Sequence, residues 1–203
     1  MVTQSSLFTP EIELLELLDG KCTFVRDFLN SRDAHDLYQT ILESVPWTQD
    51  KLTLYGKTHL TPRMSCWMAD PSLRYRYSNM TMHPTPWQKP LKTIAHAVGT
   101  HAGITFNSVL INHYRDGQDS NGWHADNERE LGPDPIVASL SLGGSRDFRL
   151  RHNETKQTHT INLTHGSLLV MHSGMQTHWQ HTVPKRAHAE SRINLTFRSI
   201  YNT

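Results

Sequence analysis

The spacing of hydrophobic positions along the chain changes near Phe106. Before that point apolar residues recur at the intervals of a helix face, and after it they occur in the short runs and alternations typical of strands. The clearest helical segment is "TPWQKPLKTIAHAVGTHAG", for which we expect a helix from Trp87 to His101 that is closed by Gly103. Its apolar stripe consists of Leu91, Ile94, Ala95 and Val98.

Two further helices are expected nearer the N-terminus. Pro10 to Leu18 contains three glutamates, which stabilise the positive end of a helix dipole when they lie in its first half. Ser31 stands as an N-cap before "RDAHDLYQTILESV", and Pro46 ends that helix because the residue before a proline disfavours helical geometry. We therefore predict a short helix over 10–18 and a longer one that begins at Ser31.

The second half of the chain predicts β-structure. Short segments rich in β-branched and aromatic residues are separated by turn signals such as Asp116-Gly117 and Gly143-Gly144. These segments are "FNSVLINHY", "IVASLSL", "RDFRLRH", "HTINL", "SLLVM", "HWQHTV" and "SRINLTFRSIY". Many short strands in a compact region favour a sandwich, jelly roll or barrel. We therefore predict an α+β fold in which the N-terminal helices pack on a β-core.

Composition narrows the class of protein. A chain of 203 residues with 36% hydrophobic and 19% charged residues is typical of one globular domain, and its longest apolar runs are too short to cross a bilayer. Met1 to Phe8 lacks the basic start and apolar core of a signal peptide, and Cys22 and Cys66 show no C-x-x-C spacing. We expect a cytoplasmic protein, or a nuclear one in a eukaryote, with no membrane partner.

The segment "RINLTFR" carries the strongest chemical signal. Four polar residues alternate with apolar ones in it: Arg192, Asn194, Thr196 and Arg198. A strand places these four on one face, which water would cover if the strand lay at an exposed edge. Inside a closed β-core, the two arginines would require an anionic partner because unpaired buried charge is very costly, and a dicarboxylate would satisfy both. In "INHY", Asn112 and Tyr114 also share a strand face and can donate hydrogen bonds to a carboxylate.

The stretch "GWHADNERE" contains candidate metal ligands. His124 and Asp126 supply two members of the two-histidine, one-carboxylate triad that binds non-haem iron(II). The third ligand must come from a later strand, and "THWQHTVP" offers His178 and His181, which their odd spacing places on opposite faces. We prefer His181 because it is closer in sequence to the arginine-bearing strand, but spacing alone leaves both open.

In the order "INHYRDG", "HAD", "HWQH" and "RINLTFR", these motifs resemble the AlkB family of Fe(II)- and 2-oxoglutarate-dependent nucleic-acid dealkylases, in particular its DNA-repair branch. The resemblance extends from Lys21 to Tyr201. It implies a single dioxygenase domain over 1–203, with an N-terminal extension at 1–20. It also implies a nucleotide-recognition lid hairpin at about 47–85 and a double-stranded β-helix (jelly-roll) core at 106–201.

The resemblance also implies a role for each motif. Iron would be held by His124, Asp126 and His181, which decides between the two late histidines. The 2-oxoglutarate cosubstrate would be bound by Asn112, Tyr114, Arg192, Asn194 and Arg198. Its two carboxylates supply the anions that two enclosed arginines require. The expected cofactors are therefore Fe(II), 2-oxoglutarate and O2.

Residues on both sides of the iron motif resemble the family's substrate-binding positions. Tyr77 would stack on a base flipped out of the helix with Tyr75 beside it, and Tyr55 and Gly56 lie where some members carry a wedge. Glu128 resembles the acidic residue that reads the exocyclic amine of the base.

Basic residues provide candidate contacts with the DNA backbone. Arg63 resembles a basic residue near the DNA, and Arg149 and Arg151 are candidate phosphate contacts. Ala125 and Asn127 stand where close relatives carry more strongly charged residues. That departure concerns the choice of lesion and not the iron chemistry.

The implied function is oxidative dealkylation of bases of the 1-methyladenine and 3-methylcytosine type in DNA. Each cycle would release formaldehyde, succinate and CO2 and so repair the base directly. Such bases are cationic, and a tyrosine face or a carboxylate favours a cation. Two alternatives stay open: a dioxygenase that acts on RNA or protein, and a non-catalytic jelly-roll module that binds a metal.

Overall fold

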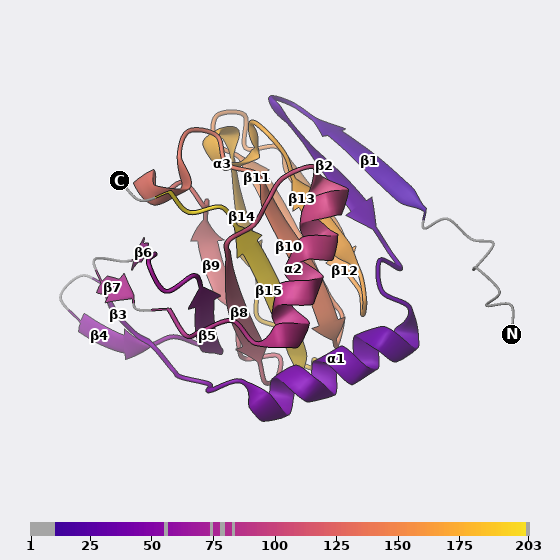
Figure 1. Cartoon of the computed structure of the whole chain (residues 1–203). Helices are drawn as coiled ribbons and strands as arrows, with labels where there is room; N and C mark the ends of the chain where they lie inside the picture. Colours follow the sequence, from indigo (N-terminus) through magenta and orange to yellow (C-terminus); the bar gives the residue numbers. More distant parts are fainter. Residues whose placement is uncertain (1–10, 55–56, 74, 78–79, 83, 202–203) are drawn as a thin grey trace, which may run out of the picture.

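The computed structural model describes residues 11–54, 57–73, 75–77, 80–82 and 84–201, with only the backbone described at 52–54, 57, 75–77 and 80–82. Within them, two antiparallel sheets pack together and two long helices cover the outer side of the larger one (Figure 1). The larger sheet has the order β1–β2–β13–β10–β15–β8–β5 and the smaller one β12–β11–β14–β9. This arrangement confirms the predicted α+β class with a jelly-roll core.

The larger sheet consists of β1 (Ile12–Leu17), β2 (Gly20–Val25), β5 (Met64–Ala69), β8 (Ser108–Tyr114), β10 (Val137–Gly143), β13 (Leu168–Met171) and β15 (Arg192–Arg198). The smaller sheet consists of β9 (Asn121–His124), β11 (Arg146–His152), β12 (Thr158–Leu163) and β14 (Trp179–Val183). All seven predicted β-segments after Phe106 are confirmed as strands.

The two long helices lie where the apolar stripes predicted them. Helix α1 spans Ser31–Ser44, but its N-cap is Asn30, whose Oδ1 accepts a hydrogen bond from the Asp33 backbone N–H at 2.9 Å. Helix α2 spans Lys89–Ala102 and ends at Gly103, which adopts φ 71°. A short helix α3 (Met175–His178) and a 3₁₀ turn η1 (Arg129–Leu131) complete the set within the described ranges. None of these helices is long and apolar enough to span a membrane.

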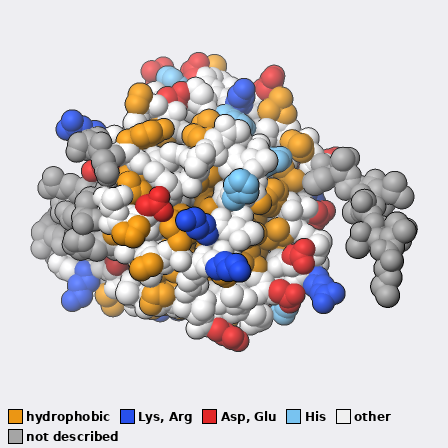
Figure 2. Space-filling view, in the orientation of Figure 1, with side chains coloured by type: hydrophobic (Ala, Val, Ile, Leu, Met, Phe, Trp, Pro, Cys, Tyr) orange, Lys and Arg blue, Asp and Glu red, His pale blue; other side chains and the backbone are white. Residues whose placement is uncertain are grey.

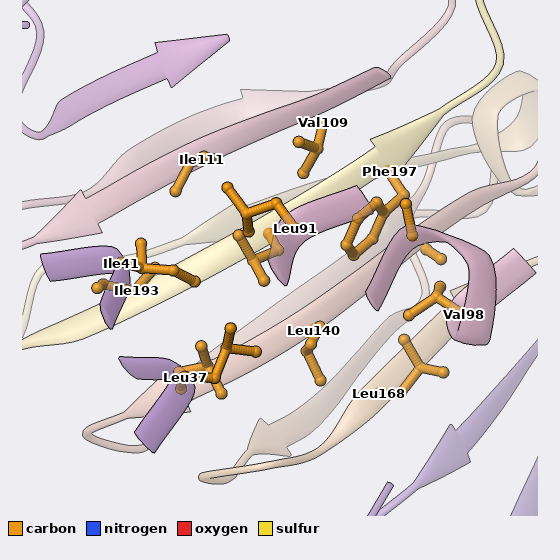
Figure 3. Close-up of a cluster of buried hydrophobic side chains, with 14 of the residues drawn as sticks. Leu37, Ile41, Leu91, Val98, Val109, Ile111, Leu140, Leu168, Ile193 and Phe197 are labelled. Atoms are coloured by element: carbon orange, nitrogen blue, oxygen red, sulfur yellow. The ribbon is translucent and has the colours of Figure 1, made fainter. Parts of the chain in front are cut away.

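The main hydrophobic core lies between these helices and the larger sheet. In Figure 3, side chains of β8, β10 and β15 point toward those of α1 and α2. Strand β15 contributes Ile193, Leu195 and Phe197, none of which is exposed. Each fully buried side chain of this kind stabilises the fold by about 1.5–3 kcal/mol. The opposite face of β15 therefore points between the two sheets. The outer surface over the helices intersperses acidic and basic side chains (Figure 2), as expected for a net charge of +1.

The predicted helix over 10–18 is wrong, because this segment forms β1 and the turn that leads into β2. Leu15 and Leu17 pack on the core between the sheets, and the alternate positions face outward. Asp19 adopts φ 56° at the turn, and β2 pairs with β13 of the core sheet. The leucine-rich pattern of this segment fits the period of a helix as well as that of a strand. Pairing with the edge of an existing sheet therefore decides that the segment forms a strand.

The segment 47–85, expected as one lid, is divided by a strand of the core sheet. A first hairpin consists of β3 (Lys51–Leu54) and β4 (Lys57–Leu60), and a second of β6 (Tyr75–Tyr77) and β7 (Met80–Met82). Between them, β5 pairs along its whole length with β8 and forms one edge of the larger sheet. The two hairpins therefore precede and follow edge strand β5 in the chain, and β5 lies next to β8, which carries Asn112 and Tyr114.

Candidate metal centre

Three residues from two strands and one loop bring their donor atoms together. His124 ends β9, Asp126 follows in the next loop, and His181 lies in β14. Strand β14 pairs with β9 so that His181 stands opposite His124, with ring centroids 4.2 Å apart. One ligand atom from each residue lies within 4.8 Å of the others. The cluster supplies the two-histidine, one-carboxylate donor set that suits non-haem iron(II).

Electrostatics keep this cluster in the protonation state that a metal needs. Burial alone would raise the pKa of Asp126, but Arg198, whose Nη2 donates to Oδ1 at 2.8 Å, and the two histidines lower it to about 2. Burial disfavours imidazolium and lowers the pKa of His181 to about 3, and it also lowers the pKa of His124. At neutral pH the site therefore presents one carboxylate and two neutral imidazoles.

His124 presents the ring nitrogen that coordination requires. Its Nδ1–H donates to the Gly122 carbonyl at 2.8 Å, so the proton lies on Nδ1. Nε2 then carries the lone pair and lies 3.9 Å from Asp126 Oδ1. Metal-binding histidines typically have their tautomer fixed in this way.

A second cluster consists of Asp19, His152 and His178. Here His152 Nδ1 accepts hydrogen bonds from the Glu154 and Thr155 backbone N–H groups at 3.3 and 3.2 Å. The proton must then lie on Nε2, which faces Asp19 Oδ2 at 3.3 Å. A protonated Nε2 has no lone pair for a metal, so this cluster joins the β1–β2 turn to β11 by polar contacts instead.

The polar face of β15 lines a cavity beside the first cluster. Asn194, Thr196 and Arg198 contribute to its wall, together with Asn112 and Tyr114 of β8. Every residue of β15 is buried, which excludes the alternative of a solvated edge strand. Strand β15 lies between β10 and β8, so both of its hydrogen-bonding edges are paired.

Arg192 is a buried cation at the far end of this strand, with 1% exposure. Its Nη2 donates to Ser141 Oγ at 2.9 Å and its guanidinium lies 5.3 Å from the Tyr114 ring centroid. Among the described residues, its Nε and Nη1 have no hydrogen-bond partner. Burial lowers its pKa to about 10, so it stays charged at neutral pH. Two unsatisfied donors on a buried guanidinium fit a carboxylate ligand.

Asn112 and Asn194 differ in the hydrogen-bond donors that remain available to a ligand. Asn112 Oδ1 accepts from Arg63 Nε at 2.9 Å, which directs its amide nitrogen elsewhere. Asn194 Nδ2 donates to Ser139 Oγ and to the Leu140 carbonyl at 2.7 and 3.2 Å. Asn194 therefore supports the cavity wall through protein contacts, and Asn112 retains free donor capacity.

The residues expected to bind the substrate lie in different parts of the structure. Arg63 is buried at 5% exposure in the cavity wall, so it faces the cavity and not an exposed DNA backbone. Glu128 is half-buried two residues past Asp126. Tyr55 and Gly56 lie outside the described residues. Tyr75 and Tyr77 form the ends of β6, and their side chains are likewise outside the description.

The outer face of the smaller sheet carries the two arginines proposed as phosphate contacts. Arg149 is exposed and Arg151 is half-buried, alternating with buried residues of β11. The Arg151 guanidinium lies 4.3 Å from the ring centroid of Trp123, which is 39% exposed, and Nη2 donates to Gln180 Oε1 at 3.2 Å. Sequence reasoning overlooked Trp123, although its position one residue before His124 places it on the opposite face of that strand.

Sequence reasoning also missed Gln176 of α3. It is buried at 1% exposure, and its Oε1 accepts a hydrogen bond from the Asp126 backbone N–H at 2.9 Å. Nothing in the local pattern indicates this contact, because 50 residues separate the two positions.

The comparisons agree with this geometry. A model of the 2OG-Fe(II) oxygenase superfamily matches residues 21–198. The human alpha-ketoglutarate-dependent dioxygenase alkB homolog 3 is 38% identical over 185 residues, which are 86% of this chain and 64% of that protein. Human DNA oxidative demethylase ALKBH2 is 38% identical over 183 residues, which are 84% of this chain and 70% of that protein. The solved structure of OsALKBH1 covers 92% of this chain with a TM-score of 0.63 and 17% identity, which supports the fold.

A jelly roll with two histidines and a carboxylate beside buried arginines is the architecture of an iron-dependent oxygenase that uses a 2-oxo acid. The chain belongs to the 2OG-Fe(II) oxygenase superfamily and, within it, to the AlkB family. The predicted cofactors, Fe(II), 2-oxoglutarate and O2, are those of this family. The chain spans 64% of the length of the human alkB homolog 3 protein that it matches.

Proposed function

We propose that this protein is an Fe(II)/2-oxoglutarate dioxygenase that removes alkyl groups from bases in DNA. The single observation that carries the proposal is the position of the His124, Asp126 and His181 cluster beside the arginine-bearing face of β15. The names of the human and bovine relatives, DNA oxidative demethylase ALKBH2, support DNA as the substrate. The reaction would convert an N-methyl base, O2 and 2-oxoglutarate to the unmethylated base in the DNA, formaldehyde, succinate and CO2.

His124, Asp126 and His181 are the proposed iron ligands. Asp126 Oδ2 is buried and has no hydrogen-bond partner among the described residues, which fits a carboxylate oxygen reserved for a cation. When bound, the iron and its 2-oxo acid supply the activation of O2 and the oxidation of the alkyl group. Arg198 holds the other oxygen of Asp126 in place, and Phe148 stacks on the His181 ring at 5.0 Å.

Arg192 and Tyr114 are the proposed partners of the distal carboxylate of 2-oxoglutarate. Arg198 already pairs with Asp126, whereas the two unsatisfied donors of Arg192 require an anion. Arg192 and Arg198 stand at the two ends of the polar face of β15, and their side chains are proposed to bind the two ends of one small dicarboxylate. Asn194 and Thr196 would form the wall between these ends, and Asn112 would donate from β8.

The flipped base is proposed to enter next to Glu128, and Tyr75 and Tyr77 to lie against it from the second hairpin. A carboxylate near the base would favour the cationic alkylated form over the neutral one. This preference gives a physical reason for acting on 1-methyladenine and 3-methylcytosine. Tyr55 and Gly56, which fall between β3 and β4 in the sequence, are the proposed wedge.

Gln176 is expected to maintain metal affinity by fixing the backbone at Asp126. In Gln176→Leu, loss of the hydrogen bond to the Asp126 N–H should weaken Mn(II) binding by about 10-fold or more, as for other residues that orient ligands. Isothermal titration with Mn(II) measures this. Gln118→Leu is the matched control, because the Gln118 side chain is exposed and its Nε2 donates to the Arg186 carbonyl and not to a metal-ligand residue. Equal Mn(II) affinity in both variants would show that Gln176 does not orient the ligand.

Arg151 is expected to contact the DNA strand on the outer face of the smaller sheet. Arg151→Ala should weaken binding of single-stranded DNA and reduce the slope of log K against log salt by about 0.7, the value for one phosphate contact. Succinate formation without DNA should not change. Fluorescence anisotropy at several salt concentrations measures the slope. Arg32→Ala on helix α1 is the control, and an identical loss in both variants argues against a specific contact.

Mass spectrometry of methylated oligonucleotides tests the proposed function as a whole. The protein is incubated with Fe(II), ascorbate and 2-oxoglutarate and with 1-methyladenine in single-stranded DNA, duplex DNA or RNA. Loss of 14 mass units from DNA with one succinate per base supports the proposal. Turnover of the RNA oligonucleotide alone would show that the substrate is RNA and not DNA. No turnover despite 2-oxoglutarate binding would leave a protein substrate as the better candidate.

A further inference from the structure

The Tyr114 ring contacts two buried arginines, and only one of them belongs to the proposed cosubstrate site. The guanidinium of Arg192 lies 5.3 Å from the Tyr114 ring centroid, and that of Arg146 lies 5.6 Å from it. Arg146 belongs to β11 of the smaller sheet and has no exposed surface. The ring is therefore in contact with a cation from each sheet.

The partners of Arg146 are backbone carbonyls from two separate loops. Its Nη1 donates to Asp116 O at 3.2 Å, and its Nη2 to Asp119 O and Pro184 O at 2.9 and 2.5 Å. The first two carbonyls lie in the β8–β9 loop and the third follows β14. The nearby Asp119 carboxylate is already engaged by Arg115 through two side-chain hydrogen bonds at 2.7 and 2.9 Å. Carbonyl dipoles orient the Arg146 guanidinium but do not cancel its charge.

The two loops meet at the point where Tyr114 and Arg192 face each other. Tyr114 ends β8 and Arg192 begins β15, and the two residues are direct partners in the sheet. The Arg186 backbone N–H donates to Gly117 O at 2.8 Å, and a Cβ on Gly117 would lie 2.3 Å from Arg186 O. The loops thus pack tightly, and Arg146 joins them directly behind the Tyr114 ring.

We propose that Arg146 is a positioning residue for the distal carboxylate of 2-oxoglutarate and makes the site select 2-oxo diacids over 2-oxo monoacids. It holds Tyr114 and the start of β15 so that the free donors of Arg192 face the carboxylate. It also adds a second buried positive charge beside the Tyr114 ring, which Arg192 contacts as well, and two donor atoms of Arg192 have no hydrogen-bond partner among the described residues. This inference rests on the proposed function, because it takes 2-oxoglutarate as the ligand.

Two five-carbon 2-oxo acids test the inference, because 2-oxopentanoate carries a methyl group where 2-oxoglutarate carries its distal carboxylate. Isothermal titration of the whole chain loaded with Mn(II) gives the affinity for each acid. In Arg146→Met, the affinity for 2-oxoglutarate should fall about 10-fold or more while that for 2-oxopentanoate and for Mn(II) stays within about twofold. Arg146→Lys, which retains the charge but loses the bridging geometry, should lose less. Arg32→Met, at an exposed position of helix α1, is the matched control.

The other outcomes distinguish a role of Arg146 in the cosubstrate site from a general structural role. Equal losses for both acids in Arg146→Met would assign Arg146 a general structural role, and unchanged affinities would exclude it from the site. If Arg146→Met does not fold, Arg146→Lys decides alone. If the affinity of Arg146→Lys for 2-oxoglutarate, divided by its affinity for 2-oxopentanoate, is lower than in the wild type, the inference is supported. An unchanged ratio contradicts it. Failure of the wild-type protein to bind 2-oxoglutarate with Mn(II) would instead contradict the proposed function.

Discussion

Replacing His181 by alanine is expected to abolish Mn(II)-dependent binding of 2-oxoglutarate and all succinate formation. The change removes one of three donor groups from a cluster in which each ligand atom lies within 4.8 Å of the others. Because even residues that only orient metal ligands are worth about 10–100-fold in affinity, loss of a ligand should exceed about 100-fold. The measurements are Mn(II) titration and succinate yield with a methylated oligonucleotide.

His178→Ala is the matched control for this prediction. His178 lies three residues earlier in the chain, and it belongs to the cluster with His152, whose tautomer leaves no lone pair for a metal. The control should bind Mn(II) and form succinate like the wild-type protein. The reverse result, an active His181→Ala and an inactive His178→Ala, would require a different metal centre.

Arg192→Met is expected to separate stability from function. The KM for 2-oxoglutarate should rise by about 100-fold or more, because the distal carboxylate loses a charge-assisted bidentate partner. The apoprotein, in contrast, should become more stable by about 1–4 kcal/mol, because a buried cation without an anionic partner is replaced by an apolar side chain of similar length. Such a gain corresponds to about 2–4 °C in Tm per kcal/mol for a chain of this size.

Thermal denaturation with and without 2-oxoglutarate measures both effects in one experiment. With Mn(II) present, 2-oxoglutarate should raise the Tm of the wild-type protein and leave that of Arg192→Met unchanged. Arg149→Met, whose side chain is exposed, should behave like the wild type. A full ligand-induced shift in Arg192→Met would show that another residue binds the carboxylate. A lower apoprotein Tm would show that Arg192 already has an adequate partner.

Local pattern predicted the elements that the site depends on. The apolar stripe of α2 and the alternation of β15 could be recognised in the sequence, because hydrophobic residues recur with the period of a helix in one and of a strand in the other. That period determines which side chains share a buried face. Alternation alone therefore predicts that the four polar residues of β15 share one face. The His-x-Asp motif indicated His124 and Asp126 as candidate metal ligands, and the family resemblance selected His181 over His178 as the third.

Local pattern was wrong or silent where the answer depended on a distant neighbour. The leucines of 10–18 suit a helix as well as a strand, and only the sheet edge offered by β2 selects the strand. Local pattern did not indicate that Arg63 is buried in the cavity wall, where its Nε donates to Asn112 Oδ1, 49 residues away; its position near the DNA stays a prediction. Gln176 and Arg146 gave no signal, because their partners are backbone groups on other elements.

The sequence by itself determined which faces of the strands are polar and which residue types could bind iron and a dicarboxylate. Tertiary structure alone decided which histidines can act, because the tautomers of His124 and His152 depend on the backbone groups that each Nδ1 meets. It also decided that the arginines of β15 are enclosed, because burial comes from β8, β10 and the facing sheet. Periodicity is a property of one segment, whereas protonation state and enclosure arise from the packing of several segments.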